Sequence, residues 1–284
     1  MKIAVTAANG HLGTAIIKQL ISEIGADKVI GIARTPSKAE YLEIEIRKGD
    51  YDKRQDFDAA LKGIDAVLIV SSMSDPQNRI GQHRNIIEAA KINGVRKIVY
   101  TSIIGDNGET AFSPIIRSNR QTEEDIKKSG LEWVIGRNGL YIEPDLEYVQ
   151  IYVSQGEISN CADEGLCSYI SRKELAHAYA KMLFEEKHNG QTYNLTGESI
   201  SQMQLAEFFN RVYKTKLIFR SISVEEYSRE RKEELGDFIG TVIGGIYEGI
   251  RNGAFNVKSD FSKATGRSYK SALEMITNFK KEEE

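Results

Sequence analysis

The sequence predicts an α/β protein in which a doubly wound parallel sheet precedes a smaller, mostly helical lobe. Short continuous apolar runs, typical of strands buried on both faces, alternate with segments whose apolar residues recur every three to four positions. The links between these segments are short, as β–α units in one sheet require. With 284 residues, the chain can hold a large domain over 1–153 and a lobe over 154–284, with 172–195 returning to the first domain.

The composition excludes several classes of protein. The chain has 38 basic and 41 acidic residues and a net charge of −3, so we expect no nucleic-acid partner. No apolar stretch approaches the ~18 residues of a membrane span, and the first residues form a strand pattern rather than a signal peptide. Cys161 and Cys167 fit neither a disulfide framework nor a zinc site, and the four histidines are scattered. We therefore expect a cytoplasmic protein without a metal.

The first β–α turn carries the strongest indication of function. An apolar run over 3–5 leads through Gly10 to Gly13, which opens a helical pattern over 15–24. Such a turn lets backbone N–H groups approach a pyrophosphate at the positive end of the helix, as in a Rossmann dinucleotide-binding domain. Ala7 stands where the usual G-x-x-G-x-x-G pattern has its first glycine. We expect its methyl group to weaken or shift dinucleotide binding without abolishing it.

The second strand, over 28–33, ends in a basic loop. Arg34 lies about twenty residues after the glycine turn, where an acidic residue would bind the ribose 2′-hydroxyl of NAD. An arginine with Lys38 nearby instead favours a 2′-phosphate through charge-assisted hydrogen bonds. The sequence therefore predicts NADPH as the cofactor, with NADH bound more weakly, unless Arg34 is only a solvated loop cation.

The next strands, over 44–50, 66–70 and 95–100, bring polar side chains to one edge of the sheet, where open α/β sheets bind ligands. Asp50 is expected either to meet the adenine amino group or to cap the helix over 55–61, and the sequence leaves both open. Small hydroxyl residues at this edge would let a ribose approach closely. The residues at these strand ends are Asp50, Tyr51, Ser71, Ser72, Met73, Thr101 and Ser102.

A sixth strand, over 131–135, completes the expected sheet. Before it we expect a helix from about Ser118, because Ser118 and Gln121 have the spacing of a capping box. His83 lies near the start of the preceding helix. It either faces the site or serves as a surface or capping residue, and the second reading is the plainer one.

Beyond residue 144 the pattern changes to that of a helical lobe. Short strands are expected near 156–159, 167–170 and 191–195. Three amphipathic helices follow further capping boxes, which combine a serine with Glu or Gln three positions on. These boxes open at Ser171, Ser201 and Ser223.

Six glycines between 236 and 253 fall almost every fourth residue and alternate with apolar side chains. On a helix they form a stripe that permits close backbone approach. Each helical glycine costs about 1 kcal/mol relative to alanine, so the segment should be soft. Close packing within the lobe is the plain interpretation, and a mobile cover over the substrate pocket or a dimer face are the alternatives.

The chain lacks the usual proton-transfer pair of short-chain dehydrogenases, a Tyr-x-x-x-Lys motif on the helix before the sixth strand. Residues 113–128 contain no tyrosine. The string occurs elsewhere, from Tyr169 to Lys173, across a strand end and a helix cap, and we interpret it as coincidence. A reaction that needs only a hydride then fits best. Quinone reduction is such a reaction, because the reduced oxygens are stabilised as phenolates.

Short motifs occur in a specific order from the first turn to the second lobe. The segments concerned are the turn to Gly13, residues 33–39, 49–51 and 100–102, Gln82 with His83 and Asn85, Ser113 with Pro114, Thr122 with Glu123, 137–139 with Tyr141, 171–176 and 192–195. Together they resemble the NmrA-like atypical short-chain dehydrogenases, nearest to the branch of type 2 NAD(P)H:quinone oxidoreductases and triphenylmethane reductases.

This resemblance implies NADPH on the first turn and the strand ends, with the nicotinamide near Thr101 and Asn138. Asn119 stands where relatives carry histidine or lysine beside the nicotinamide ribose, and it can hydrogen-bond a hydroxyl but carries no charge. The expected catalytic residues are Asn119, Asn138 and Tyr141, the last two shaping the acceptor pocket with the glycine-rich segment. The expected cofactor-binding residues are Thr6, Ala8, Asn9, Gly10, His11, Leu12, Gly13, Arg34, Lys38, Asp50, Tyr51, Ser71, Ser72, Met73, Thr101, Ser102 and Asn119.

The leading hypothesis is an NADPH-dependent reductase that transfers a hydride to a quinone or a similar flat, conjugated acceptor without a tyrosine–lysine pair. The rival is a non-catalytic dinucleotide sensor that binds a regulatory partner, which Ala7 and Asn119 favour. A reductase of triphenylmethane-type dyes differs from the first only in its acceptor. The sequence sets neither the physiological acceptor nor the oligomeric state, for which a homodimer is one option.

Overall fold

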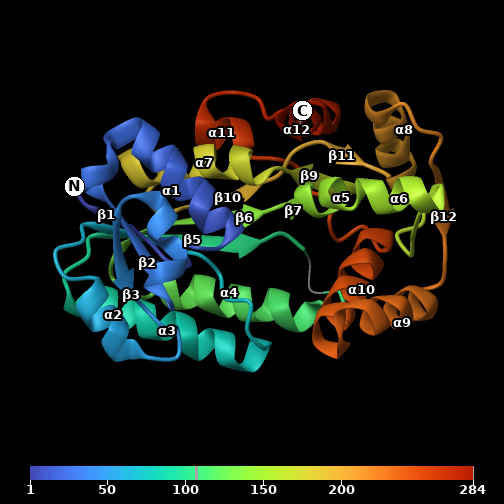
Figure 1. Ribbon diagram of the computed structural model, residues 1–284. Helices are drawn as coiled ribbons and strands as arrows, with labels where there is room; N and C mark the ends of the chain where they lie inside the picture. The colour runs from blue at the N-terminus through green and yellow to red at the C-terminus, as the bar shows by residue number, and fades with distance from the viewer. Residues whose placement is uncertain (106–107, 284) are drawn as a thin grey trace.

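A seven-stranded sheet forms the centre of the molecule, and all of its strands are parallel (Figure 1). The computed structural model describes residues 1–105 and 108–283. The strand order is β10-β6-β5-β4-β1-β2-β3. From β1 the chain adds β2 and β3 on one side and then β4, β5 and β6 on the other, so the strand order reverses between β1 and β4. The predicted doubly wound parallel sheet is thereby confirmed. The strands are β1 (Ile3–Val5), β2 (Val29–Ala33), β3 (Glu45–Lys48), β4 (Ala66–Ile69), β5 (Lys97–Ile103), β6 (Glu132–Asn138) and β10 (Gln191–Leu195).

Helices cover both faces of this sheet (Figure 1). Ile3 and Val5 pack into one core and Ala4 into another, because successive side chains of a strand point to opposite faces. All three are fully buried, which explains the unbroken apolar run. The helices are α1 (His11–Ile24), α7 (Arg172–Phe184) and α11 (Phe261–Thr265) on the first face, and α2 (Arg54–Ala60), α3 (Pro76–Ile92) and α4 (Ser113–Lys127) on the second.

The remaining elements form a lobe, whose helices α9 and α10 lie beyond the carboxyl ends of β5 and β6 (Figure 1). Here β9 pairs with β7 and β11, and β8 pairs with β12. In the described ranges no helix is long and apolar enough to cross a membrane. The elements of the lobe are β7 (Leu140–Tyr141), α5 (Glu143–Glu147), α6 (Val149–Gln155), β8 (Glu157–Asn160), β9 (Cys167–Ile170), β11 (Ser199–Ile200), α8 (Gln202–Tyr213), β12 (Ile218–Ser221), α9 (Val224–Leu235), α10 (Asp237–Arg251) and α12 (Ala272–Glu283). The 3₁₀ helices at Ala26–Lys28, Pro36–Leu42 and Glu186–His188 instead connect elements of the large sheet and its covering helices.

Serine caps begin three helices of the second half of the chain, as predicted. Ser171, Ser201 and Ser223 are N-cap residues, and each side chain accepts a hydrogen bond from the backbone N–H three positions on. At Ser201 the capping box is complete, because the Gln204 side chain also accepts from the Ser201 N–H. These local signals satisfy donors that helix formation would otherwise leave without partners.

The predicted helix start at Ser118 is wrong. Helix α4 begins at Ser113 and carries Pro114 in its first turn, where the fixed φ of proline favours a helix start. Ser118 is buried within the helix, and its hydroxyl donates to the Ile115 carbonyl at 2.8 Å. An earlier and stronger start signal therefore overrides the capping-box spacing.

The glycine-rich segment forms α10 and packs closely against its neighbours. A Cβ atom on Gly240 would overlap the backbone of α9, and one on Gly245 would overlap the backbone at Phe112. Gly249 lies in the same way against the ring of Phe255. These glycines thus lie on the packed faces of α10, as expected if the stripe serves close packing within the lobe. The apolar side chains between them line a cavity.

Ala7 adopts a left-handed backbone conformation, with a φ of 50°. A Cβ atom approaches the following carbonyl in this region, which costs an L-residue roughly 1–2 kcal/mol. Hydrogen bonds hold the turn on both sides, because the Thr6 N–H donates to the Leu68 carbonyl and the Ala8 N–H to the Ile32 carbonyl, each at 3.0 Å. The alanine in place of the first glycine is therefore accommodated as strain.

We expect Ala7→Gly to raise the free energy of unfolding by about 0.5–1 kcal/mol, because relief of strain exceeds the extra entropy of the unfolded chain. Ala8→Gly is the matched control. Ala8 is fully buried and has no positive φ, so its replacement should lower stability. Chemical denaturation measures both, and equal losses in the two variants would contradict strain at Ala7.

Candidate active site

The first turn presents an open helix N-terminus. Gly10 is the N-cap of α1, no side chain caps the helix, and its first turn holds no acidic residue. The N–H groups and the positive end of the helix dipole are therefore available to an anion. A Cβ atom on Gly13 would overlap the Ala7 carbonyl oxygen, so glycine is required for this close approach. The turn fits a dinucleotide pyrophosphate.

The other expected cofactor-binding residues of this turn differ in exposure. Asn9 and His11 are exposed on either side of Gly10. Ala8 and Leu12 are buried beneath the turn. Only the first two side chains can reach a ligand directly, whereas the buried pair shapes the turn from below.

Thr6 and Tyr51 lie at the same strand edge but bind each other. The Tyr51 hydroxyl donates to Thr6 Oγ1 at 2.6 Å and also lies 2.7 Å from the Val70 carbonyl oxygen. Thr6 Oγ1 accepts a further hydrogen bond from the Val70 N–H at 2.9 Å. Burial raises the pKa of Tyr51, so its hydroxyl stays protonated. These contacts join β1 to the end of β4, which positions the rim of the sheet.

Arg34 and Lys38 follow the end of β2, and both side chains are exposed. In the part of the chain that the structure describes, neither forms an ion pair or a side-chain hydrogen bond. Both cations are therefore available to a phosphate group. This arrangement fits the 2′-phosphate that the sequence predicts at this edge.

Asp50 lies half-buried after β3, and its carboxylate accepts a hydrogen bond from the Asp52 N–H at 3.2 Å. The expectation that it caps the following helix is wrong, because the N-cap of α2 is Lys53. A turn closed by the Lys53 N–H on the Asp50 carbonyl separates the strand from the helix. Contact with an adenine amino group stays a prediction.

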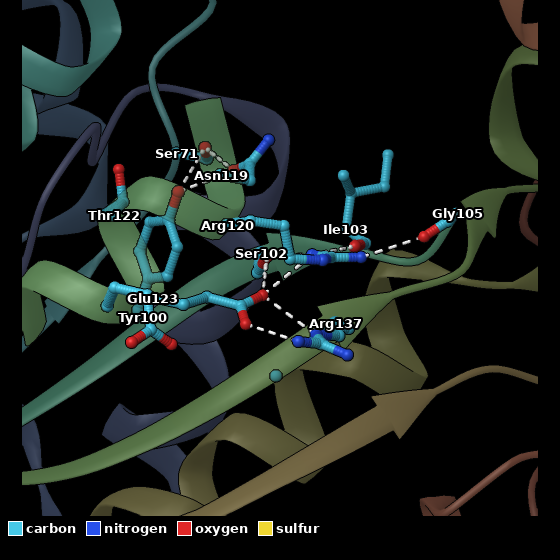
Figure 2. Close-up of polar contacts among 12 residues, drawn as sticks. Ser71, Tyr100, Ser102, Ile103, Gly105, Asn119, Arg120, Thr122, Glu123 and Arg137 are labelled. Carbon is cyan, nitrogen blue, oxygen red and sulfur yellow. Dashed lines mark hydrogen bonds and ion pairs between the residues drawn. The ribbon is translucent and has the colours of Figure 1, made fainter. Parts of the chain in front are cut away.

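Ser71, after β4, lies in a group of hydrogen bonds that fixes Asn119. The Ser71 N–H donates to Thr101 Oγ1 at 2.9 Å, and its hydroxyl donates to Asn119 Oδ1 at 2.8 Å. The Tyr100 hydroxyl donates to the same oxygen at 2.6 Å, and Figure 2 shows it beside Ser71 and Asn119. Asn119 Nδ2 donates to the Ile115 carbonyl. Partners on separate elements thus hold the amide in one orientation.

Ser72 is held by the helix that follows it. Its N–H donates to His83 Nε2 at 3.0 Å, and its hydroxyl donates to Gln82. Burial, with a further contribution from the charge of Arg79, lowers the pKa of His83 to about 3, so the ring is neutral. His83 is therefore neither a surface nor a capping residue and instead supports the strand end. Met73 is exposed at the mouth of the cavity.

Ser102 belongs to a buried ion cluster around Glu123, which Figure 2 shows. The Ser102 hydroxyl donates to Glu123 Oε1 at 2.6 Å, and Arg120 and Arg137 bind this carboxylate at 2.8 and 2.6 Å. Burial acts to raise the pKa of Glu123, but the bonds from Arg137 and Ser102 and the charge of Arg120 outweigh it and hold the pKa below its usual value. Glu123 stays ionised, and Ser102 is fixed.

Asn138, at the end of β6, contacts Tyr141. The Tyr179 hydroxyl donates to Asn138 Oδ1 at 2.6 Å, and Asn138 Nδ2 donates to the Tyr141 hydroxyl at 3.2 Å. The Arg172 guanidinium lies 5.4 Å from the centre of the Tyr141 ring. Burial raises the pKa of Tyr141, which keeps it protonated at neutral pH. The pair therefore offers hydrogen bonds rather than a charge.

A cavity of about 560 Å³ separates the strand ends from the lobe. This volume lies within the ~300–1,000 Å³ of typical small-molecule sites. Its polar wall contains the expected residues Ser71, Ser72, Thr101, Ser102, Asn119, Asn138 and Tyr141, and the apolar side chain of Met73 lines the cavity beside them. Its apolar wall comes from the start of α4 and from α10, through Phe112, Ile115, Val242, Ile243, Ile246 and Ile250.

The Tyr-x-x-x-Lys string does not form a catalytic pair. Tyr169 is buried in the wall of the cavity, whereas Lys173 is exposed and forms an ion pair with Glu282 at 3.1 Å. The two side chains therefore lie in different environments, one buried and one exposed. The lysine is not placed to lower the pKa of the tyrosine.

Arg79 lines the cavity, and sequence reasoning did not identify it. Its side chain is 3% exposed, and Nη2 donates to Ser71 Oγ at 2.6 Å and lies 3.3 Å from Asn119 Oδ1. In the described residues it forms no ion pair, and its Nε has no hydrogen-bond partner. Burial lowers its pKa, yet arginine remains protonated in proteins. A buried cation without a counter-ion makes this part of the cavity suitable for negative charge.

Comparison with known proteins shows the family to which the chain belongs. Residues 7–186 match the model of the NAD(P)H-binding family. The chain belongs to this family. It is 29% identical to quinone oxidoreductase 2 of Escherichia coli strain K12 over 285 residues, which cover 97% of this chain and 98% of the relative.

Two solved structures cover nearly the whole chain. The first is triphenylmethane reductase of Citrobacter sp. complexed with NADP(H), with a TM-score of 0.91, 29% identity and coverage of 98% of this chain and 100% of the other. The second is the NADPH-dependent quinone oxidoreductase of E. coli complexed with NADPH, with a TM-score of 0.89, 28% identity and coverage of 97% and 99%. The predicted NmrA-like family, the NAD(P)H cofactor and the class of NAD(P)H-dependent oxidoreductases are confirmed.

We expect Arg79→Met to raise the free energy of unfolding by about 1–2 kcal/mol, because an unpaired buried cation is replaced by an apolar side chain of similar length. The same change should lower kcat/KM for acceptor reduction by about tenfold or more, because negative charge in the cavity loses its partner. The control is Arg84→Met. Arg84 is an exposed arginine on the same helix and forms an ion pair with Asp125. Thermal unfolding and steady-state kinetics measure the two effects, and a joint loss of stability and activity would assign Arg79 a structural role.

Proposed function

We propose that this protein is an NADPH-dependent reductase that transfers a hydride to a quinone or a similar flat, conjugated acceptor. The cavity carries this proposal, because its polar wall at the strand ends suits a nicotinamide and its apolar wall on α10 suits a flat ring. NADPH, when bound, supplies the hydride. The fold and the family are those of NAD(P)H-linked reductases, and the names of the relatives support a quinone as acceptor.

The buried charges suit this chemistry. A quinone that gains a hydride becomes an anion, with negative charge on a ring oxygen. Arg79, whose Nε is unpaired, is a buried cation in the cavity wall that would stabilise this oxygen, and such stabilisation is strong where water is excluded. Asn138 and Tyr141 would orient the ring through their amide and hydroxyl groups. No tyrosine–lysine pair is needed at the hydride-transfer step, because the product of that step is a phenolate, which is a stable anion.

The preference for NADPH over NADH, the cytoplasmic location and a homodimer are further parts of this proposal. Exposed Arg34 and Lys38 support the cofactor preference, because both are free to bind a 2′-phosphate. The expected site residues of the first turn would hold the pyrophosphate on the backbone of α1. The lobe would then close the acceptor side through α10.

The function is tested by the absorbance decay of NADPH with the purified protein and a simple benzoquinone or naphthoquinone. We expect enzyme-dependent decay, because the cavity would bring the nicotinamide and the acceptor together. The decay should be faster with NADPH than with NADH, because Arg34 and Lys38 would bind the 2′-phosphate. A reaction without enzyme is the control. If NADPH binds but is consumed with none of the quinones tried, the result would contradict a reductase and favour a dinucleotide sensor.

We expect Arg34→Asp to lower the affinity for NADPH by roughly 10- to 100-fold relative to NADH, which corresponds to the ~1.5–3 kcal/mol of hydrogen bonds to a charged group. Lys216→Asp, an exposed residue of the lobe with the same change of charge, controls for net charge. Titration of both cofactors against the protein fluorescence measures the ratio. An unchanged ratio in Arg34→Asp would show that this residue does not bind the 2′-phosphate.

A further inference from the structure

Asp145 is a buried carboxyl group in the wall of the cavity, and the chemistry described above does not use it. The residue lies in α5 and is 4% exposed. The Tyr152 hydroxyl donates to its Oδ1 at 2.9 Å, and the Tyr247 hydroxyl lies 3.5 Å from the same atom. Tyr169 contributes another hydrogen bond. All three tyrosines line the cavity as well.

No cation neutralises this carboxyl group within the described ranges, since Asp145 forms no ion pair there. Arg231, on α9, instead pairs with Glu234 at 2.8 Å and lies over the ring of Tyr227. Burial raises the pKa of Asp145, and the tyrosine hydrogen bonds offset this only in part. The titratable and charged groups around it are Tyr152 of α6, Cys167 and Tyr169 of β9, Tyr227 and Arg231 of α9 and Tyr247 of α10.

We propose that Asp145 is the proton donor to the reduced acceptor, an inference that rests on the proposed quinone reductase. The acceptor gains a hydride with its electron pair and becomes a hydroquinone anion. The O–H bond of the Asp145 carboxyl group then breaks while an O–H bond forms on the acceptor oxygen. NADPH is oxidised to NADP⁺, the quinone is reduced by two electrons, and a proton from solvent restores the carboxyl group.

The carboxyl group is a better donor than the tyrosines that surround it. Burial raises the pKa of Tyr152, Tyr169 and Tyr247 well above the usual value, so their protons are held tightly at neutral pH. Their hydroxyls instead donate hydrogen bonds, which stabilise the carboxylate that remains after proton transfer. The tyrosines are therefore positioning residues, and Asp145 is the acid.

The first test compares the pH dependence of quinone reduction by the wild type and by Asp145→Asn, whose amide nearly matches the carboxyl group in size. In the wild type, kcat should fall as pH rises through the pKa of Asp145, because the donor loses its proton. In the variant, kcat should be about 100-fold lower and independent of pH over this range. Asp145→Glu should recover part of the rate and of the pH dependence. The control is Asp163→Asn, because Asp163 is a half-buried aspartate outside the cavity wall that pairs with Arg251.

The N-methylacridinium ion separates proton donation from recognition of charge. This cation becomes neutral when it accepts a hydride, so its reduction requires no proton. Asp145→Asn should therefore leave kcat for acridinium unchanged while it slows quinone reduction. Loss of acridinium reduction with an unchanged quinone rate would show that Asp145 binds cations, and would overturn the proposal. If the wild type does not reduce acridinium, the pH dependence of quinone reduction decides. The proposal is overturned if kcat depends on pH in the same way in Asp145→Asn and in the wild type.

Thermal unfolding gives a measurement that does not depend on catalysis. Because folding raises the pKa of Asp145, the folded state holds this proton more tightly than the unfolded state does. Stability is therefore lost as pH rises from the unfolded pKa through the folded pKa. The wild type should therefore lose Tm relative to Asp145→Asn as pH rises between the unfolded and the folded pKa. Below the unfolded pKa, the difference in Tm between the two proteins should stay constant. A difference that is constant at every pH would overturn a protonated donor. Absence of NADPH consumption by the wild type would instead contradict the proposed function alone.

Discussion

The polar wall of the cavity depends on one buried carboxylate, that of Glu123 in α4. Its side chain is 1% exposed and binds Arg120 of its own helix, Arg137 of β6 and Ser102 of β5. Arg120 also donates to the Ile103 carbonyl, so the cluster joins the helix to two strand ends (Figure 2). Loss of one partner would leave a buried charge uncompensated, which costs about 3–5 kcal/mol. Because this cluster fixes α4 against the sheet, it also fixes Asn119, one turn earlier on the same helix.

Much of the fold could be predicted because strands buried on both faces of a sheet appear in the sequence as continuous apolar runs. The strand Ile3–Val5 is apolar throughout, and each of its side chains enters one of the two cores. Helix starts could be predicted where a single local signal acts, as at Ser201. At Ser118 a proline nearer the true start competes, and the same spacing of residues is then misleading. Local rules predict the elements better than their boundaries.

The candidate site could be predicted in outline, since the carboxyl ends of parallel strands meet at one edge. Ser71, Thr101 and Asn138 line the same cavity for this reason. The partners of each side chain could not be predicted, and the Tyr51 hydroxyl binds Thr6. Arg79 and Asp145 were missed because charged residues on helices are usually solvated, and no spacing distinguishes the buried exceptions. Tertiary packing alone decides which charges are enclosed.

Arg79 and Asp145 are buried ionisable residues of the cavity wall, and they lie on separate elements. Arg79 lies among the hydroxyl and amide groups of the strand ends, whereas Asp145 lies among tyrosines of the lobe. An ion pair between them would neutralise both and remove their effect on a ligand. Held apart, the arginine remains a free positive charge and the carboxyl group remains able to hold a proton. This separation suits a site that first accumulates negative charge on an acceptor and then protonates it.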